Sequence, residues 1–179
     1  MTSWGEIERR EPVLAARVRG VFDRYVHKTM ATLRADGSPR ISATEVDFFA
    51  GEAWIGSMGQ ARKTLDLWRD PRVAVHSGTA GPEDIDGAGD AKIAGRVVAV
   101  TDPALVARVA GSAVAPGPVH LFRLDVDEIV ATDVGDTGDD LVVDFWTAAT
   151  GRRIVRRPGP RGVACAGSSS RDHRHLVMH

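Results

Sequence analysis

The residues best suited to chemistry are two adjacent cations, Arg62 and Lys63, which follow a turn containing Gly56, Ser57 and Gly59. The pattern after this turn predicts a short helix, with Ser57 as the residue that caps its amides. Cations at a helix N-terminus are misplaced by up to about 1 kcal/mol unless an anion compensates them. Amides, a hydroxyl and two cations at one point are typical of an anion site. The alternative is that both side chains extend into water, or that only one of them reaches a ligand, because neighbours on a helix face different directions.

The elements around this turn must hold the two cations in place. The helix has a predicted apolar side formed by Ala61, Leu65 and Trp68, at three- and four-residue spacing. Pro71 ends it, because proline disfavours helical geometry in the residue before it. The flanking segments, residues 53–56 and 72–77, are predicted to be strands.

The rest of the chain reads mainly as strands. A β-hairpin is predicted around Asp36-Gly37, and Gly95 indicates a bulge or a close backbone approach within its strand. Few helices and many strands favour a mainly antiparallel barrel over a parallel α/β sheet. The predicted helices are residues 2–24, interrupted at Pro12, and 103–110; the predicted strands are 27–33, 40–48, 91–100, 119–131 and 141–147.

Length and composition limit the classes of protein that come into question. The chain has 179 residues, which fits one domain, and a net charge of −1, which gives no general electrostatic case for nucleic acid or an anionic membrane. No apolar run approaches the roughly 20 residues of a membrane span, and the charged N-terminus is unlike a signal peptide. With a single cysteine, Cys165, the chain is predicted to be cytoplasmic.

Three segments, in this order, resemble the pyridoxamine 5′-phosphate oxidase-like family of flavin-binding split β-barrels. They are residues 30–40 (Met-Ala-Thr-Leu-Arg-Ala-Asp-Gly-Ser-Pro-Arg), residues 56–72 with Arg62-Lys63 and Asp70-Pro71-Arg72, and residues 91–97 (Ala-Lys-Ile-Ala-Gly-Arg-Val). The resemblance spans about residues 26–100 in register and extends more loosely to residue 147. It implies a mainly β, six-stranded antiparallel split barrel with accessory helices, and a homodimer with a flavin-type cofactor at its interface.

The resemblance also implies roles for single residues. Arg62 and Lys63 match the family's phosphate-binding pair, and Arg40 matches an arginine that helps to hold the phosphate in the oxidase. Glu45, however, stands where the oxidase has a second phosphate lysine, and the oxidase's C-terminal substrate-binding region is not recognisable, so the chain is predicted to be a relative of that enzyme. The strand along the flavin ring and the edge near its phosphate match Ile41, Ser42, Ala43 and Thr44, and Ile55, Gly56 and Ser57, respectively.

Further candidates have a structural interpretation beside the functional one. His76 ends a strand near the predicted cleft, where it could contact a flavin ring or simply stabilise the strand end. Ser42 and Thr44 could donate to the ring or be ordinary polar positions. Trp54 and Trp68 are predicted core residues, as is Trp146, which could also cover a partner chain's flavin. No His, Cys, Asp or Glu cluster has metal-ligand spacing, so no metal is predicted.

The leading hypothesis is an FMN-dependent oxidoreductase that transfers a hydride to or from a small organic substrate, with catalytic residues left open because flavin carries that chemistry. The alternatives are a reductase that uses the deazaflavin coenzyme F-420, and a non-catalytic FMN- or haem-binding protein. The predicted organisation is N-terminal helices in residues 1–25, a split-barrel flavin domain in residues 26–157, and a disordered tail in residues 158–179.

Overall fold

The structure is a computed structural model that describes residues 2–78, 89–110, 119–135 and 140–158. The predicted tail, residues 158–179, lies outside the described residues apart from residue 158. The elements, in chain order, are α1 (Trp4–Arg10), α2 (Pro12–Asp23), β1 (Lys28–Leu33), β2 (Pro39–Thr44), β3 (Asp47–Phe49), β4 (Glu52–Met58), α3 (Arg62–Arg69), β5 (Arg72–His76), β6 (Asp90–Val100), α4 (Pro103–Ala110), β7 (Val119–Val134), β8 (Asp140–Thr147) and β9 (Gly151–Pro158).

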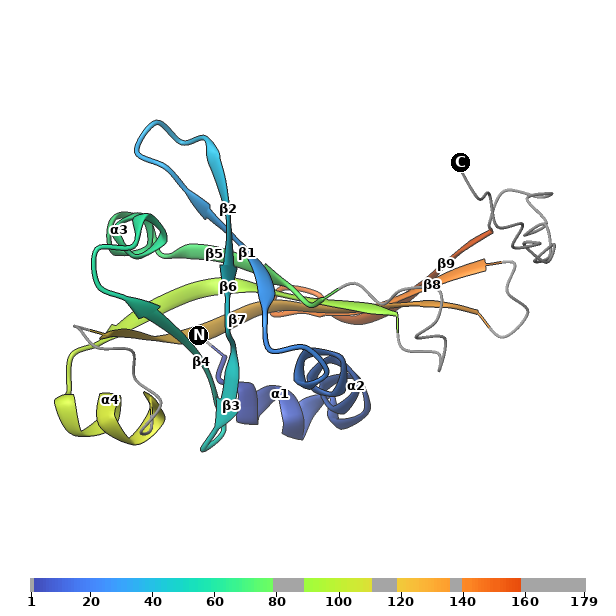
Figure 1. Cartoon of the computed structure of the whole chain (residues 1–179). Helices are drawn as coiled ribbons and strands as arrows, with labels where there is room; N and C mark the ends of the chain where they lie inside the picture. Colours follow the sequence, from blue (N-terminus) through green and yellow to red (C-terminus); the bar gives the residue numbers. More distant parts are fainter. Residues whose placement is uncertain (1, 79–88, 111–118, 136–139, 159–179) are drawn as a thin grey trace, which may run out of the picture.

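All strand pairs are antiparallel, and neighbouring strands follow the order β2-β1-β5-β6-β7-β4-β3, with β8 and β9 added beyond the second half of β7 (Figure 1). The sheet curls until β2 approaches β4, but no ladder joins these two strands. The predicted antiparallel split barrel with accessory helices is therefore confirmed. Within the described residues the sheet has nine strands, because the predicted strand 40–48 is interrupted at Glu45-Val46 and because β9 adds a strand that the sequence does not indicate.

The core lies between the sheet and the two N-terminal helices, which pack side by side beneath it in Figure 1. Pro12 occupies the first turn of α2, where its missing N–H is harmless, and so separates the helices as predicted. Each helix faces the sheet with an apolar stripe, and the strands contribute alternate residues. The largest fully buried side chains are Trp4, Phe22, Phe122, Ile7, Leu14, Met30, Ile55, Ile93, Leu124, Ile129, Val18 and Val75.

Two glycines shape the sheet as the sequence predicts. Gly37 has a φ of +81° in the turn between β1 and β2, where glycine adopts left-handed geometry at little cost. At Gly95 the pairing of β6 with β7 shifts register, which is a β-bulge. A Cβ at this position would lie 2.0 Å from the carbonyl oxygen of Asp125. The bulge therefore brings two backbones closer together than any side chain permits.

The predicted apolar side of α3 is wrong. Leu65 and Trp68 are 45% and 51% exposed, whereas Thr64, Asp66 and Leu67 are buried. One side of α3 packs on β4 and the other faces the β1–β2 hairpin. These two neighbours decide which residues of the helix are buried, and the apolar spacing alone does not identify those residues. Trp68 is consequently not a core residue, although its ring contacts Phe122 edge-on at a centroid distance of 5.9 Å. Trp54 and Trp146 are buried as predicted.

Ser57 does not cap α3. The N-cap is Ala61, and no side chain caps the helix. Ser57 belongs to β4, and its buried Oγ accepts a hydrogen bond from Thr64 Oγ1 at 2.6 Å. The serine thus ties the helix to the strand by a side-chain contact, while the amides of the first turn have no side-chain acceptor of their own.

Candidate functional site

The split in the barrel leaves two backbone edges facing each other. β2 ends the path of paired strands, and residues 55–58 of β4 pair with β7 alone among the described strands. α3 begins immediately after β4 and so starts beside this opening (Figure 1). Backbone groups at an unpaired edge can bind a ligand in place of a neighbouring strand.

Lys63 reaches across this opening. Its Nζ donates a hydrogen bond to the carbonyl oxygen of Ala43 in β2, with a donor–acceptor distance of 2.6 Å. Burial lowers the pKa of the Lys63 ammonium from its ordinary value, and the nearby Glu45 carboxylate opposes that shift. Among the described residues this ammonium group donates to one carbonyl, and it has lost part of its hydration, so an added anion would stabilise its charge.

Arg62 points to a different side of α3. Together with Leu65, Asp66 and Arg69 it forms a stripe at positions i, i+3, i+4 and i+7, which faces the β1–β2 hairpin. Between this stripe and the hairpin lies a cavity of about 360 Å³, to which we refer as the arginine cavity. Its lining residues are Arg34, Ala35, Asp36, Arg40, Arg62, Leu65, Asp66 and Arg69. The two adjacent cations therefore project from different sides of one helix, Lys63 toward β2 and Arg62 toward the arginine cavity.

Asp66 holds the arginine cavity together. Its side chain is 4% exposed and accepts hydrogen bonds from Thr32 Oγ1 at 3.0 Å, Arg40 Nε at 2.6 Å and Arg69 Nη2 at 3.1 Å. Burial alone would raise the pKa of Asp66, but the bonds from Arg40, Arg69 and Thr32 outweigh it and lower that pKa. A buried, ionised carboxylate thus joins β1, β2 and α3 and fixes the orientation of two guanidinium groups.

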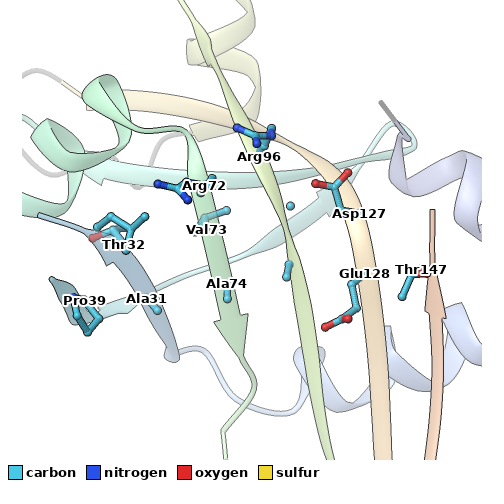
Figure 2. Close-up of a pocket in the computed structure, with 13 residues that line it drawn as sticks. Ala31, Thr32, Pro39, Arg72, Val73, Ala74, Arg96, Asp127, Glu128 and Thr147 are labelled. Atoms are coloured by element: carbon cyan, nitrogen blue, oxygen red, sulfur yellow. The ribbon is translucent and has the colours of Figure 1, made fainter. Parts of the chain in front are cut away.

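The outer face of the sheet carries a second, shallower cavity of about 510 Å³. Its floor is a row of small side chains on three neighbouring strands, Ala31, Ala74 and Ala94, which are cross-strand partners. Figure 2 shows Arg72 and Arg96 at one end of this floor, and Asp127 and Glu128 on the far side. We call this surface the alanine trough, and it is apolar in the middle with opposite charges at its borders.

His76 lies on the same outer face, one row beyond the alanines. Ala43, Thr29, His76 and Lys92 are successive cross-strand partners, so His76 is two strands away from β2. Its Nδ1 lies 2.7 Å from the Ser77 carbonyl oxygen, and its Nε2 lies 3.6 Å from a carboxylate oxygen of Asp90. These contacts give His76 a defined orientation, but it does not border the arginine cavity.

The remaining predicted site residues lie on β2 and β4, where successive side chains point alternately outward and inward. Ile41 and Ala43 project outward from β2, while Ser42 is half-buried and Thr44 is buried, with its hydroxyl donating to the Glu45 carbonyl oxygen at 3.3 Å. In β4 the side chains of Ile55 and Ser57 point inward, and a Cβ added at Gly56 between them would meet only open space. The backbone of this segment, rather than its side chains, is thus what a ligand could reach.

Asp66, Arg34 and Arg69 belong to the site but were not among the residues predicted from the sequence. Residues 62, 65, 66 and 69 have helical spacing and could be recognised as one face of a helix. Three of the four are charged, however, so a pattern based on apolar residues does not select them. The contribution of Arg34 depends on how the hairpin folds toward α3. In the described part of the chain, no group of three or more His, Cys, Asp or Glu residues could hold a metal ion, and no helix has the length and apolarity to cross a membrane.

Comparison with known proteins agrees with this geometry. The family profile of pyridoxamine 5′-phosphate oxidase matches residues 19–133, while no curated protein matches the chain. Among solved structures, a pyridoxamine 5′-phosphate oxidase-related, FMN-binding protein from Nostoc punctiforme PCC 73102 is similar, with a TM-score of 0.53 and 10% identity over 84% of this chain and 96% of that one. A Listeria innocua protein provisionally described as a pyridoxamine 5′-phosphate oxidase has a TM-score of 0.52 and 15% identity, over 64% and 94% of the two chains.

A haem-binding protein from Mycobacterium smegmatis has a TM-score of 0.51 and 14% identity over 83% of this chain and 89% of that one. At such low identities these structures establish the fold and leave the ligand open. The family profile extends over more than half of the sequence and contains β1 to β6, α3 and most of β7. The chain therefore belongs to the pyridoxamine 5′-phosphate oxidase family.

Proposed function

We propose that the chain is a flavin-dependent oxidoreductase that binds FMN at the split of the barrel and acts on a small organic substrate. One observation carries the proposal: the first turn of α3 sends Lys63 to the free edge of β2 and Arg62 to a cavity shared with Arg40. The strand expected along the ring and the cations expected at the phosphate thus lie beside one opening.

The residues present fit such a cofactor. A phosphate needs cationic or N–H donors, and four arginines exceed two aspartates by two positive charges in the arginine cavity. No hydrogen bond or ion pair to Arg62 occurs among the described residues, so its guanidinium has donors available for a ligand. A planar ring needs a smooth surface with backbone groups at its edge, which Ala43 and the unpaired edge of β2 provide.

In the proposed reaction the cofactor and the protein have separate roles. Bound flavin supplies hydride transfer. Arg62, Lys63 and Arg40 hold the anionic end of the cofactor, and β2 orients its ring. Glu45 stands close enough to Lys63 to favour the charged ammonium. His76 is held by Asp90 and the Ser77 carbonyl on the same outer face as Ala43, where it can contact the ring or a substrate.

A titration tests the phosphate contact. Arg62→Ala and Lys63→Ala should each weaken FMN binding by one to two decades, since a charge-assisted contact is worth roughly 1.5–3 kcal/mol. Riboflavin, which lacks the phosphate, should bind wild type and both variants alike. Arg153→Ala, an exposed arginine of β9, is the matched control. If FMN affinity stays within about twofold in both variants, the two cations are merely solvated and the proposal fails.

The deazaflavin coenzyme F-420 is the second candidate cofactor, because it shares the phosphate and carries further anionic groups beyond it. The four arginines of the arginine cavity suit these further anionic groups, which supports this second candidate. The visible spectrum of the purified protein separates the candidates: two bands of oxidised flavin support FMN, a single violet-blue band supports deazaflavin, and a Soret band would indicate haem.

The proposal includes a homodimer assembled through the alanine trough. A two-fold axis brings the same patch of both chains together, so arginines on one side of the patch can meet acids on the other. Arg96 against Asp127 and Glu128 gives the trough this self-complementary charge around an apolar floor, while Arg72 is already paired with Asp70 at 2.6 Å. The protein should sediment at about 38 kDa, twice the chain mass of 19.2 kDa.

Charge reversal tests this surface. Arg96→Glu should convert dimer to monomer, and the double variant Arg96→Glu/Glu128→Arg should restore the dimer. A monomer that binds FMN stoichiometrically would contradict the assembly, while a dimer insensitive to Arg96→Glu would move the interface to another face.

A further inference from the structure

We infer that Glu52 and Asp125 hold one proton between them, and that this proton makes the attachment of the N-terminal segment sensitive to pH. The two carboxyl groups lie outside the candidate site, where residues 2–5 meet the start of β4 and the middle of β7. We call this place the N-terminal joint. The inference is independent of the proposed function, because no cofactor or substrate takes part in it.

Two neighbouring strands bring the carboxyl groups together. The ladder between β4 and β7 ends at Ala53 opposite Leu124, and Glu52 and Asp125 are the next residues of their strands, on one face of the sheet. Side chains at facing positions have Cβ atoms about 4.5–5.5 Å apart, and like charges there destabilise the pair. When two carboxyl groups share such a place, the pKa of one of them rises.

Three enclosed polar atoms of the joint have no hydrogen-bond partner among the described residues: Glu52 Oε2, Asp125 Oδ2 and Arg123 Nε. Arg123 Nη2 donates to the other carboxylate oxygen of Asp125 at 3.2 Å, and the Asp125 side chain is only 7% exposed. One guanidinium thus faces two carboxyl groups, which leaves one negative charge uncompensated if both are ionised. A proton on Glu52 Oε2 removes this charge, and it can be donated to Asp125 Oδ2, so that both free oxygens gain a partner.

The surroundings of Glu52 favour its protonated form. Burial raises the pKa of Glu52 above its ordinary value of 4.5, Arg123 opposes this shift and Asp125 adds to it. Other charged residues that pairing or contact places beside the joint form no ion pair with either carboxyl group in the described part of the chain. They are Arg9 of α1, Asp47 of β3, Arg96 of β6, Arg108 of α4 and Asp127 of β7.

The same joint attaches the N-terminal segment to the sheet. Val126 N donates to the Thr2 carbonyl oxygen at 2.9 Å, and Gly5 N donates to the Gly51 carbonyl oxygen at 2.7 Å (Figure 1). Val126 and Gly51 are the chain neighbours of the two carboxyl residues. A Cβ added at Gly5 would lie 3.2 Å from the Gly51 carbonyl oxygen, so the two backbones are in direct contact. Any movement that separates the carboxyl groups therefore strains both attachments.

Loss of the shared proton weakens this attachment. A carboxyl group whose pKa is higher in the folded than in the unfolded protein gives a stabilisation that is complete below its ordinary pKa and is lost as the pH rises through the folded pKa. Ionised Glu52 repels Asp125, and the repulsion is relieved when residues 2–5 and the start of β4 move away from β7. The joint is thus closed with the proton bound and opens more often without it.

The pH dependence of thermal stability tests the shared proton. Melting temperatures of the full chain are recorded from about pH 5 to 8 for wild type, Glu52→Gln and Asp125→Asn, with Asp23→Asn at an exposed carboxylate as the control. Over this range the difference between Glu52→Gln and wild type should move in favour of the variant by at least about 2 °C. Asp125→Asn should move in the same direction, whatever constant loss it suffers through Arg123, and Asp23→Asn should not.

Hydrogen exchange tests the effect on the N-terminal segment. At about pH 8 the amides of Gly5 and Val126 should exchange at least about threefold faster in wild type than in Glu52→Gln, and at about pH 5 equally fast. The amide of Gly37 in the β1–β2 turn should exchange alike in both proteins at each pH. Parallel melting profiles of wild type and the two variants would overturn the shared proton, and diverging profiles with equal exchange at Gly5 and Val126 would overturn its effect on the segment. If Glu52→Gln does not fold, Asp125→Asn takes its place in both measurements, since only the pH-dependent part of each difference counts.

Discussion

Replacing Asp66 by asparagine should destabilise the fold and loosen the candidate site together. The substitution keeps the volume of the side chain but removes the charge that faces Arg40 and Arg69, and it exchanges one acceptor oxygen for an NH₂ group. A hydrogen bond to a charged group contributes roughly 1.5–3 kcal/mol. Because the side chains of Arg40 and Arg69 are 23% and 41% exposed, water screens both contacts. We therefore expect a loss of about 2 kcal/mol in the free energy of unfolding.

Urea denaturation measures this loss, and a thermal scan should show a melting temperature lower by about 4–8 °C for a protein of this size. The control is Asp23→Asn, which removes an exposed carboxylate paired with Arg19 at 3.5 Å and should cost no more than about 0.5 kcal/mol. A loss below about 0.5 kcal/mol for Asp66→Asn would refute the reasoning.

The pH dependence supplies an independent check. The pKa of Asp66 in the folded protein lies below its ordinary value of 3.8, so its stabilising effect is complete above that value and is lost as the pH falls through the folded pKa. The difference between wild type and Asp66→Asn should accordingly be constant from about pH 5 to 7 and shrink below about pH 4. A difference that persists unchanged into the acid range would show that packing, and not charge, is the cause.

Four further variants concern the framework and can be checked by urea denaturation. Gly95→Ala should cost roughly 2–3 kcal/mol, because its Cβ would meet a backbone carbonyl of β7 at 2.0 Å. Gly20→Ala should stabilise by about 0.5–1 kcal/mol, because Gly20 lies within α2 and a Cβ there meets nothing within 4 Å. Arg152→Ala should cost roughly 2–4 kcal/mol, since it leaves the buried carboxylate of Asp144 without its two donors at 2.9 and 2.8 Å. Arg156→Ala, on the same strand, removes a side chain that is 61% exposed and pairs with Asp140, so it should cost less than about 1 kcal/mol. Equal losses in Arg152→Ala and Arg156→Ala would contradict the distinction.

Local backbone chemistry made much of the fold predictable. Pro12, Gly37 and Gly95 each have one conformational property that dominates their neighbourhood, and each appears in the structure with the predicted effect. Alternation also identified the hairpin, because β-branched and apolar residues there follow a period of two. These signals require no knowledge of distant contacts.

The errors lie where a distant element decides which residue is buried. Nothing local to α3 shows that the hairpin covers Asp66, so the apolar spacing selected Leu65 and Trp68 in its place. β9 was missed because four arginines in Gly151–Pro158 obscure the alternation, and β8 stabilises it through Asp144 and Asp140. The candidate site shares this limit: Arg62 and Lys63 were identifiable in sequence, but their divergence to two sides of the helix follows from packing.

The composition of β9 has a consequence for how copies of this protein behave at high concentration. Among the described strands it is the outermost one beyond β8 and is exposed nearly throughout, so it presents a row of backbone groups that could template a further strand from another molecule. Two of its arginines, Arg152 and Arg156, are neutralised by aspartates, but Arg153 and Arg157 have no such partner among the described residues. Two such edges repel each other, and Pro158 removes the next backbone donor. Arg153→Val/Arg157→Val would take away this protection, so the variant should form sheet-rich aggregates under conditions in which wild type stays dispersed.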